Sequence, residues 1–383
     1  MNFLYLSKNF EILKHWKKIT KKQSTKELND LCEKHKLFCY FYNITYNLFS
    51  QLPKRKDGAD SFSHPCNVVE LLKNAKINDE VCFCAGIAHD YIEEMVDLYG
   101  KINNIKSDTK GKKQLDNYAI KITKELKQNA LNQFSKNKKY KQMINDIIAV
   151  LILLTRYKRH HYYSSLSKLF KFKEKNLRRL AIKIKLADRL HNILSLHNYP
   201  KHLRIYQCFK NLFIINSTKE YLIEERKNIN SKEFAPLIKL FKKCSKATYD
   251  ALLSIEYDIS LNRKVFEASS ILQLAFQKFT YEHNGLRAVT KLNVKEKHPM
   301  RLFEAIIRKY DFWLHLDKKE YEKAQELERL YCKHFFKKLN LNDEQINEII
   351  NYKDAYTLKE IIARLLYDKN YVLKGFTTNR LFL

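Results

Sequence analysis

Glycine and proline are scarce in this chain. Only 6 glycines and 5 prolines occur among its 383 residues, and clear alternating apolar runs bounded by Asn-Gly or Asp-Gly pairs are absent. Proteins built from many hairpins need such turns, so their scarcity argues against a sheet protein. The sequence therefore predicts an all-α fold.

Long apolar runs and paired cysteine motifs are also missing. The longest apolar run, Ile147 to Leu154, is far shorter than the ~20 residues of a membrane span. The start of the chain has no long apolar core followed by a small-residue cleavage site, which argues against secretion. The 8 cysteines, among them Cys82 and Cys84, form no Cys-x-x-Cys pair and are expected to be reduced core residues. We expect a soluble cytoplasmic protein with no membrane partner.

Acidic residues are few, at 42 against 72 lysines and arginines, which leaves a formal net charge of +30. Such a charge would suit nucleic-acid binding. The lysines are spread over the whole chain, however, which indicates a solvated surface and argues against a nucleic-acid partner. A basic field still attracts a highly anionic nucleotide. A denser patch of cations and aromatics at residues 156–163 is interpreted either as close to a substrate or as a surface loop.

One acid lies on the apolar stripe of a predicted helix. Asp188 belongs to the run Lys185 to Asn192, and a second apolar stripe lies beside the first. The first stripe consists of Leu177, Leu180, Ala181, Ile184, Ala187 and Asp188. A buried carboxylate without a counter-charge costs several kcal/mol, roughly, so we expect a cation or several donors beside Asp188.

Two further segments end or begin on potential metal ligands. The apolar run 81–88 is followed by His89 and Asp90, and His64 precedes Pro65 where a helix is expected to start. Taken singly, each residue has a structural interpretation. His64 could be a helix-start histidine, His89-Asp90 a solvent-facing pair at a helix end, and Asp188 one half of an ion pair with Arg189. Together, imidazole and carboxylate groups suit zinc, manganese or iron.

The order of these residues resembles the HD metal-dependent phosphohydrolase superfamily. Over residues 46–198 it resembles most the alarmone hydrolase domain of RelA/SpoT proteins, which remove the 3′-pyrophosphate from guanosine tetra- and pentaphosphate. The resemblance rests on Arg55-Lys56, Gly58, His64-Pro65, His89-Asp90, Glu93-Glu94 and, as its most specific part, the run Lys185 to Asn192.

The resemblance implies a role for each matching residue. One metal ion, usually manganese in this family, would be held by His64, His89, Asp90 and Asp188. Water would be handled by Glu93 and Glu94, and the substrate would be bound by Arg55, Lys56, Asn192 and Ser195. A divalent ion activates water and neutralises phosphoryl charge, and Glu93, three residues after Asp90 on a continuing helix, would face the same side as a general base.

The chain departs from the family pattern at several positions. Glu94 stands where the family has Asp, Ser195 replaces a Thr, and Leu194 replaces an Arg. The interval between Asp90 and Asp188 is longer than in the family, and the lysine-rich segment 101–141 is expected to hold the extra length. Two alternatives therefore stay open: an HD phosphohydrolase of another nucleotide, and a weakly active nucleotide sensor or antitoxin-like partner protein.

The sequence predicts three regions. Residues 1–50 form an N-terminal helical segment packing on the HD domain, 51–200 form the HD hydrolase domain, and 201–383 form an additional helical C-terminal region. No alarmone synthetase domain can be found. The C-terminal helices are expected to offer a surface for a second copy or a protein partner, and they are predicted at 217–226, 234–255, 300–314, 319–339 and 343–366.

Overall fold

Helices joined by turns account for most of the chain in the computed structural model, which describes residues 25–55, 58–134, 137–160, 162–225, 231–261, 270 and 318–373. No strand occurs in these ranges, so the predicted all-α fold is confirmed. Before the 3₁₀ helix η1 (Leu196–Asn198) the helices are α2 (Thr25–Lys34), α3 (Lys36–Phe49), α4 (Ser63–Asn74), α5 (Glu80–Ile87), α6 (Tyr91–Ile102), α7 (Thr109–Phe134), α8 (Lys138–Leu154), α9 (Tyr162–Phe170) and α10 (Lys175–Leu194). After η1 come α11 (Lys201–Glu224), α12 (Ala235–Ser260), α15 (Lys318–Phe335), the 3₁₀ helix η4 (Lys337–Leu339) and α16 (Asp343–Tyr367).

The described residues form two compact units. The first, called the 25–191 unit, consists of residues 25–191 and 231–241; the second, called the 192–373 unit, consists of 192–225 and 242–373, each apart from the gaps given above. The division between the two units falls within α10 and within α12. In α10 it lies after His191, whereas the sequence predicts a boundary at residue 200. Residues 25–49, predicted as a separate segment, belong to the same unit as α4 to α9.

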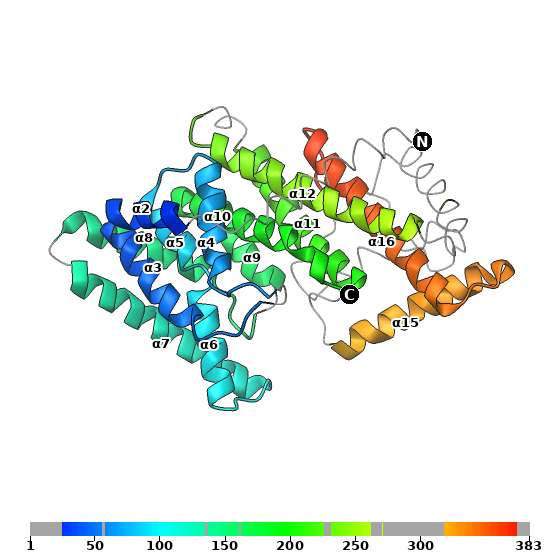
Figure 1. Ribbon diagram of the computed structural model, residues 1–383, viewed down its shortest axis with the longest axis horizontal. Coiled ribbons are helices and arrows are strands. Elements are labelled where there is room, and N and C mark those ends of the chain that lie inside the picture. Colours follow the sequence, from blue (N-terminus) through cyan, green and yellow to red (C-terminus); the bar gives the residue numbers. More distant parts are fainter. Residues whose placement is uncertain are drawn as a thin grey trace. The chain divides into compact units, whose positions relative to one another are not determined.

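Helix α5 is the centre of the 25–191 unit. Every residue from Cys82 to Ile87 is buried, because α3, α4 and α8 all pack against this short helix (Figure 1). Helix α5 is apolar on all sides, which is the pattern expected of a fully buried helix. Its start is set by Asp79, whose side chain accepts a hydrogen bond from the Cys82 backbone N–H at 3.1 Å. The C-terminal end of this helix delivers His89 and Asp90.

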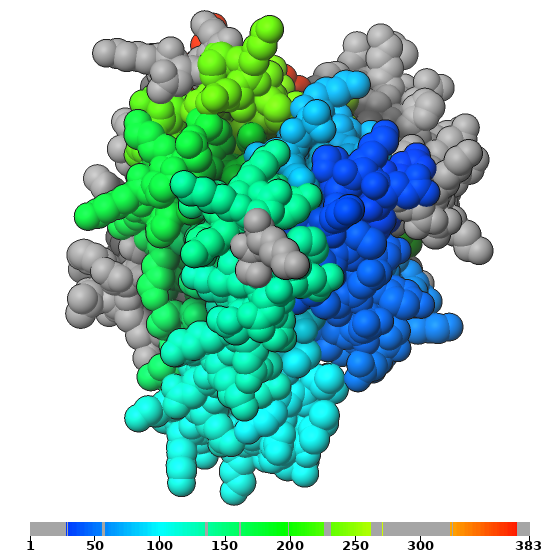
Figure 2. All heavy atoms as spheres, turned by 90° about the vertical axis from the view of Figure 1, so that its left-hand side faces the viewer, coloured from blue at the N-terminus to red at the C-terminus, as the bar shows by residue number. Residues whose placement is uncertain are grey.

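The lysine-rich segment 101–141 is largely helical. Helix α7 packs against α6 and α8, and the ring of Tyr40 in α3 meets that of Phe134 edge-on with centroids 5.9 Å apart. Figure 2 shows this face of the molecule, with the blue residues of α2 and α3 beside the blue-green residues of α7 and α8. The buried side of α7 includes Ala119, Ile122, Leu126 and Ala130. The extra length in this part of the chain therefore forms an amphipathic layer that packs on the unit.

Gly111 in the first turn of α7 provides a stability prediction. A Cβ atom added there would lie 1.9 Å from the Lys106 backbone oxygen, so Gly111→Ala must move the backbone of the preceding turn. We expect the substitution to lower the free energy of unfolding by about 1–3 kcal/mol, as overpacking does. Urea denaturation measures this. Gly100→Ala is the control, because its Cβ would meet only the flexible end of Leu115 at 3.2 Å; an equal loss in both variants would contradict the prediction.

In the 192–373 unit, α16 packs against α11 and α15. It begins at Asp343 after a capping box formed by Asn342 and Gln345, which agrees with the predicted helix 343–366. Helix α11 begins at Lys201, although the sequence predicts a helix only from 217. Its residues 205–215 are buried on several sides, which blurs the 3.6-residue period used to find helices. The predicted helix 300–314 lies outside the described residues.

The burial of the cysteines agrees with the prediction that they are core residues. All 8 cysteines are free, and most are buried, including Cys82 and Cys84. Within the part of the chain that the structure describes, no helix has the length and apolar character that crossing a membrane requires.

Candidate metal centre

His64 lies at the start of α4, as predicted. It is the second residue of this helix and only 4% exposed. Pro65 follows within the first turn, where a missing backbone N–H leaves no hydrogen bond unmade. Because α4 packs against the buried helix α5, the imidazole points into the interior of the 25–191 unit.

His89 and Asp90 lie in the turn between α5 and α6. Asp90 precedes the first residue of α6, so the helix expected to continue through these positions is instead interrupted between Ala88 and Asp90. The interruption lets a buried helix end on two polar side chains. His89 is 2% exposed, and its Nδ1 atom lies 2.8 Å from the Gly86 carbonyl oxygen. A proton on Nδ1 donates this hydrogen bond and leaves the Nε2 lone pair available for a metal.

The structure brings the predicted ligand atoms together. His64 Nε2 lies 3.1 Å from His89 Nε2, 3.4 Å from Asp90 Oδ2 and 3.4 Å from Asp188 Oδ1. His89 Nε2 lies 3.1 Å from Asp90 Oδ2, and one atom from each of His64, His89 and Asp90 fits within a 4.8 Å span. Ligands bound to one divalent ion at roughly 2.0–2.2 Å are separated by about 3.0–3.5 Å from their neighbours. The spacing of His64, His89 and Asp90, two imidazoles with one carboxylate, therefore fits a single divalent ion, and Asp188 adjoins this group through His64.

Asp188 has the cationic partner that its sequence context predicts. It is 4% exposed, and its Oδ2 atom pairs with Lys185 Nζ at 2.8 Å. Burial opposes the charged form of Lys185, but the Asp188 carboxylate outweighs it and raises the lysine pKa. The ion pair holds one carboxylate oxygen while the other faces His64. Lys185 is thus a positioning residue, a role that its place in the sequence does not reveal.

His191 is a second residue, besides Lys185, whose contact with the site was not predicted from the sequence. Its Nδ1 atom lies 2.8 Å from Nδ1 of His64, on the side of the ring opposite the ligand atom. Burial, together with the charges of His64 and Arg55, lowers the pKa of His191 to about 3, so this imidazole is neutral. A neutral His191 can accept the Nδ1 proton of His64 and fix its tautomer for metal binding. The signal in the sequence is the spacing of His191 three residues after Asp188 on one helix.

Glu93 and Glu94 lie in the first turn of α6, beside Asp90. The backbone N–H of Arg156 donates a 2.7 Å hydrogen bond to Glu93 Oε1, which orients this carboxyl group. Burial and the nearby Asp90 carboxylate raise the pKa of Glu93, and the same causes, with Asp97, raise the pKa of Glu94 to about 7. Carboxyl groups with raised pKa values are suited to proton transfer near neutral pH.

The basic patch 156–163 is attached to the helices that carry these glutamates. Lys158 pairs with Asp97 of α6, and Arg159 Nε pairs with the buried Asp116 of α7 at 2.7 Å. The backbone N–H of Lys158 also donates to Asp116, at 2.6 Å. These contacts, with the Arg156 contact to Glu93, place the patch next to the candidate site.

The predicted substrate-binding residues fall partly in the 25–191 unit and partly in the 192–373 unit. Arg55 is half-buried in the turn before α4, and its charge acts on His191. Lys56 lies outside the described residues. Asn192 and Ser195 belong to the 192–373 unit, where Ser195 Oγ donates to the Asn192 backbone oxygen at 3.2 Å. Substrate roles for these four residues stay predictions.

Metal binding is expected to depend on pH through His89. Burial disfavours the imidazolium, but Asp90 and Asp188 outweigh it and raise the His89 pKa to about 9. A metal must displace this proton, so we expect the dissociation constant for Mn²⁺ to fall about tenfold per pH unit between pH 6.5 and 8.5. Titration calorimetry in buffers of different ionisation enthalpy would show proton release; an affinity independent of pH would contradict the prediction.

The raised pKa of His89 also makes the stability of chelator-treated protein depend on pH. A histidine pKa raised in the folded state contributes stability that is present below the unfolded value of about 6.5. That contribution is lost as pH rises through about 9. Protein prepared without metal should therefore become less stable over this pH window.

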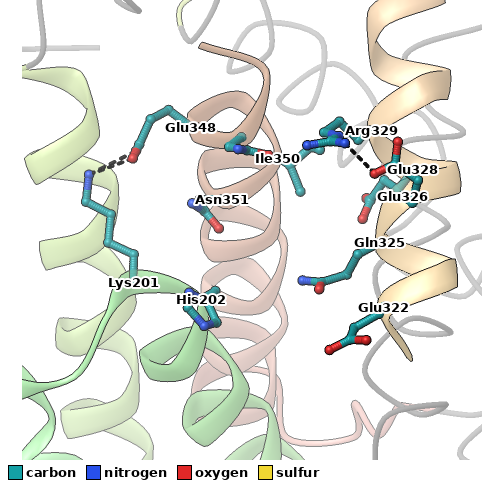
Figure 3. Close-up of a pocket in the computed structure, with 11 residues that line it drawn as sticks. Lys201, His202, Glu322, Gln325, Glu326, Glu328, Arg329, Glu348, Ile350 and Asn351 are labelled. Atoms are coloured by element: carbon teal, nitrogen blue, oxygen red, sulfur yellow. Dashed lines mark hydrogen bonds and ion pairs between the residues drawn. The ribbon is translucent and has the colours of Figure 1, made fainter. Parts of the chain in front are cut away.

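A polar cavity of about 550 Å³ lies in the 192–373 unit (Figure 3). Its cations are paired with glutamates: Lys201 with Glu348 at 2.9 Å, and Arg329 with Glu326 at 2.5 Å. Glu322 and Gln325 of α15 face His202 of α11 across the space.

Comparison of the chain with known protein families, with curated proteins and with solved structures gave no match.

Proposed function

We propose that this protein is a metal-dependent hydrolase that removes the 3′-pyrophosphate from guanosine tetra- or pentaphosphate. The observation that carries the proposal is the convergence of His64, His89 and Asp90 within a 4.8 Å span, with Asp188 3.4 Å from His64. These residues come from separate parts of the sequence, in the order typical of HD phosphohydrolases. The resemblance to the alarmone hydrolases supplies the substrate.

The candidate site has the groups that this hydrolysis requires. A bound divalent ion would lower the pKa of water and neutralise charge on a phosphoryl oxygen. Glu93, held by the Arg156 backbone N–H, can take the proton from the attacking water. Glu94, with a pKa of about 7, can exchange protons with solvent or with the leaving group at neutral pH.

Positive charge beside the site supports an anionic substrate. The Arg156 side chain is exposed, lies near enough to Glu93 to lower its pKa, and forms no ion pair with any described residue. Arg55 lies near enough to His191 to lower the pKa of that imidazole. Guanidinium groups bind phosphate through paired hydrogen bonds, so these two arginines are suited to a pyrophosphate.

Other nucleotides remain competing substrates. Leu194, Ser195 and Glu94 differ from the alarmone hydrolase pattern, and the first two fall where that family lines its nucleotide pocket. A protein that binds the alarmone without turning it over would fit a sensor or an antitoxin-like partner.

The test is incubation of the purified full chain with Mn²⁺ and guanosine tetraphosphate, followed by anion-exchange chromatography. Release of pyrophosphate with formation of guanosine diphosphate supports the proposal. Hydrolysis of other nucleotides alone would favour a different HD phosphohydrolase, and binding without turnover would favour the sensor. If the protein neither binds nor hydrolyses guanosine tetraphosphate or another nucleotide, the proposal is overturned.

A further inference from the structure

A carboxylate is buried on the otherwise basic helix α7. Asp116 is 2% exposed, whereas the other acid of this helix, Glu125, and most of its lysines lie on the surface. A buried carboxylate is costly unless hydrogen-bond donors and a counter-charge surround it. The groups that supply these contacts to Asp116 are therefore held in place by it.

The donors that the structure gives to Asp116 come from the loop between α8 and α9. The Lys158 backbone N–H donates to Oδ1 at 2.6 Å, and the Arg159 backbone N–H donates to Oδ2 at 3.4 Å. The Arg159 side chain adds the counter-charge, with Nε 2.7 Å from Oδ2. Moving this loop would leave a buried carboxylate without donors, so Asp116 fixes the backbone of residues 158 and 159.

The same loop reaches the candidate metal centre two residues earlier. The Arg156 backbone N–H donates to Glu93 Oε1 at 2.7 Å, and the Lys158 ammonium group pairs with Asp97 on the next turn of α6. The loop is thus attached to α6 by Glu93 and Asp97 and to α7 by Asp116, all within the 25–191 unit. Because the loop is fixed on both sides, the position of Arg156 depends on Asp116.

Arg156 carries the cation of this loop that remains for a ligand. Lys158 and Arg159 are already paired with acids of α6 and α7. The exposed Arg156 side chain forms no ion pair with any described residue, and its charge is close enough to Glu93 to lower the pKa of that carboxyl group. A guanidinium group beside the candidate general base is suited to a phosphate group bound there.

We propose that Asp116 is a positioning residue, which holds the loop 156–159 so that the Arg156 guanidinium group contacts the pyrophosphate of the substrate beside Glu93. The nature of the substrate in this inference rests on the proposed function. Asp116 acts through the loop and not by contact with the substrate. Helix α7 thereby has a role in substrate binding besides its packing on the unit.

The experiment is a double-mutant cycle on the purified chain, with calorimetry of inorganic pyrophosphate binding at a fixed excess of Mn²⁺. Arg156→Met removes the guanidinium group but keeps the backbone contact to Glu93, and it should weaken binding about tenfold or more. Asp116→Asn keeps an oxygen for the Lys158 N–H but loses the charge, and it should weaken binding about three- to tenfold.

The combined variant distinguishes positioning from a purely structural role. Added to Arg156→Met, Asp116→Asn should weaken binding by less than about twofold, because the group that it positions is gone. A purely structural role for Asp116 would weaken binding by the same factor with or without the Arg156 side chain.

Glu125→Gln is the matched control, since it removes an exposed acid of α7 that pairs with Lys121 at 3.7 Å. It should leave the affinity for pyrophosphate unchanged. Thermal unfolding checks that each variant is folded. If Asp116→Asn does not fold, Arg159→Met takes its place, because it removes the same ion pair from the exposed partner and should show the same dependence on Arg156.

The proposal is overturned if the wild type does not bind pyrophosphate, if Asp116→Asn binds it as tightly as the wild type, or if the effects of Asp116→Asn and Arg156→Met multiply in full. The hydrolase assay is a separate result. Pyrophosphate binding with a non-additive cycle but no hydrolysis of any nucleotide would support this proposal and refute the hydrolase. Hydrolysis of guanosine tetraphosphate with an additive cycle would do the reverse.

Discussion

Replacing His89 with alanine is expected to abolish pyrophosphate release while the helices remain folded. His89 Nε2 lies 3.1 Å from both His64 Nε2 and Asp90 Oδ2, so its loss opens the ligand set. Since a divalent ion contributes several kcal/mol to such a transition state, the rate should fall by about 10³-fold or more. Chromatography of the reaction measures the rate, and circular dichroism checks the fold. Full activity would show that the ligand assignment is wrong.

Asp188→Ala should also abolish turnover, but with a different effect on stability. It leaves the Lys185 ammonium without the carboxylate 2.8 Å away, and breaking a buried ion pair costs about 3–5 kcal/mol. The double variant Lys185→Met/Asp188→Ala removes both charges, so it should recover much of the stability and none of the activity. A double variant as unstable as Asp188→Ala would mean that this pair is not what the single substitution disrupts.

Glu93→Gln is expected to lower kcat by about 10²–10⁴-fold without loss of metal binding, as removal of a general base does. The amide keeps an oxygen that can accept the 2.7 Å hydrogen bond from Arg156, so the local structure should persist. Activity measured over pH, with Mn²⁺ binding measured in parallel, separates this result from loss of the ion.

The control for Glu93→Gln is Glu125→Gln. Glu125 is exposed on α7, where it pairs with Lys121 at 3.7 Å. This substitution should leave kcat unchanged. Equal losses in both variants would indicate a general effect of charge, and unchanged kcat in Glu93→Gln would remove it from the mechanism.

The sequence was most informative where a polar residue interrupts an apolar pattern. Asp188 on a buried stripe implied a hidden partner, and Lys185 is that partner. The identity of the partner could not be read from the pattern, because Lys185 itself looks like one more solvated lysine in a chain of +30 net charge. His191 was missed for a similar reason, since its role depends on a 2.8 Å contact with a residue far away in sequence.

Local geometry and long-range packing were less predictable. The interruption of the helix at Asp90 could not be anticipated, because no glycine or proline lies between Ala88 and Asp90. Helix α11 was found only in part, since burial on several sides removes the amphipathic period. Partners of the C-terminal helices and the cytoplasmic location stay predictions.

The most direct test of the metal centre is a titration of the chelator-treated chain with Mn²⁺, monitored by calorimetry. The account predicts one tightly bound ion per chain, and binding weakened at least a hundredfold in both His64→Ala and His89→Ala. Wild-type protein that binds no divalent ion, or that binds one equally well without these two imidazoles, would contradict it.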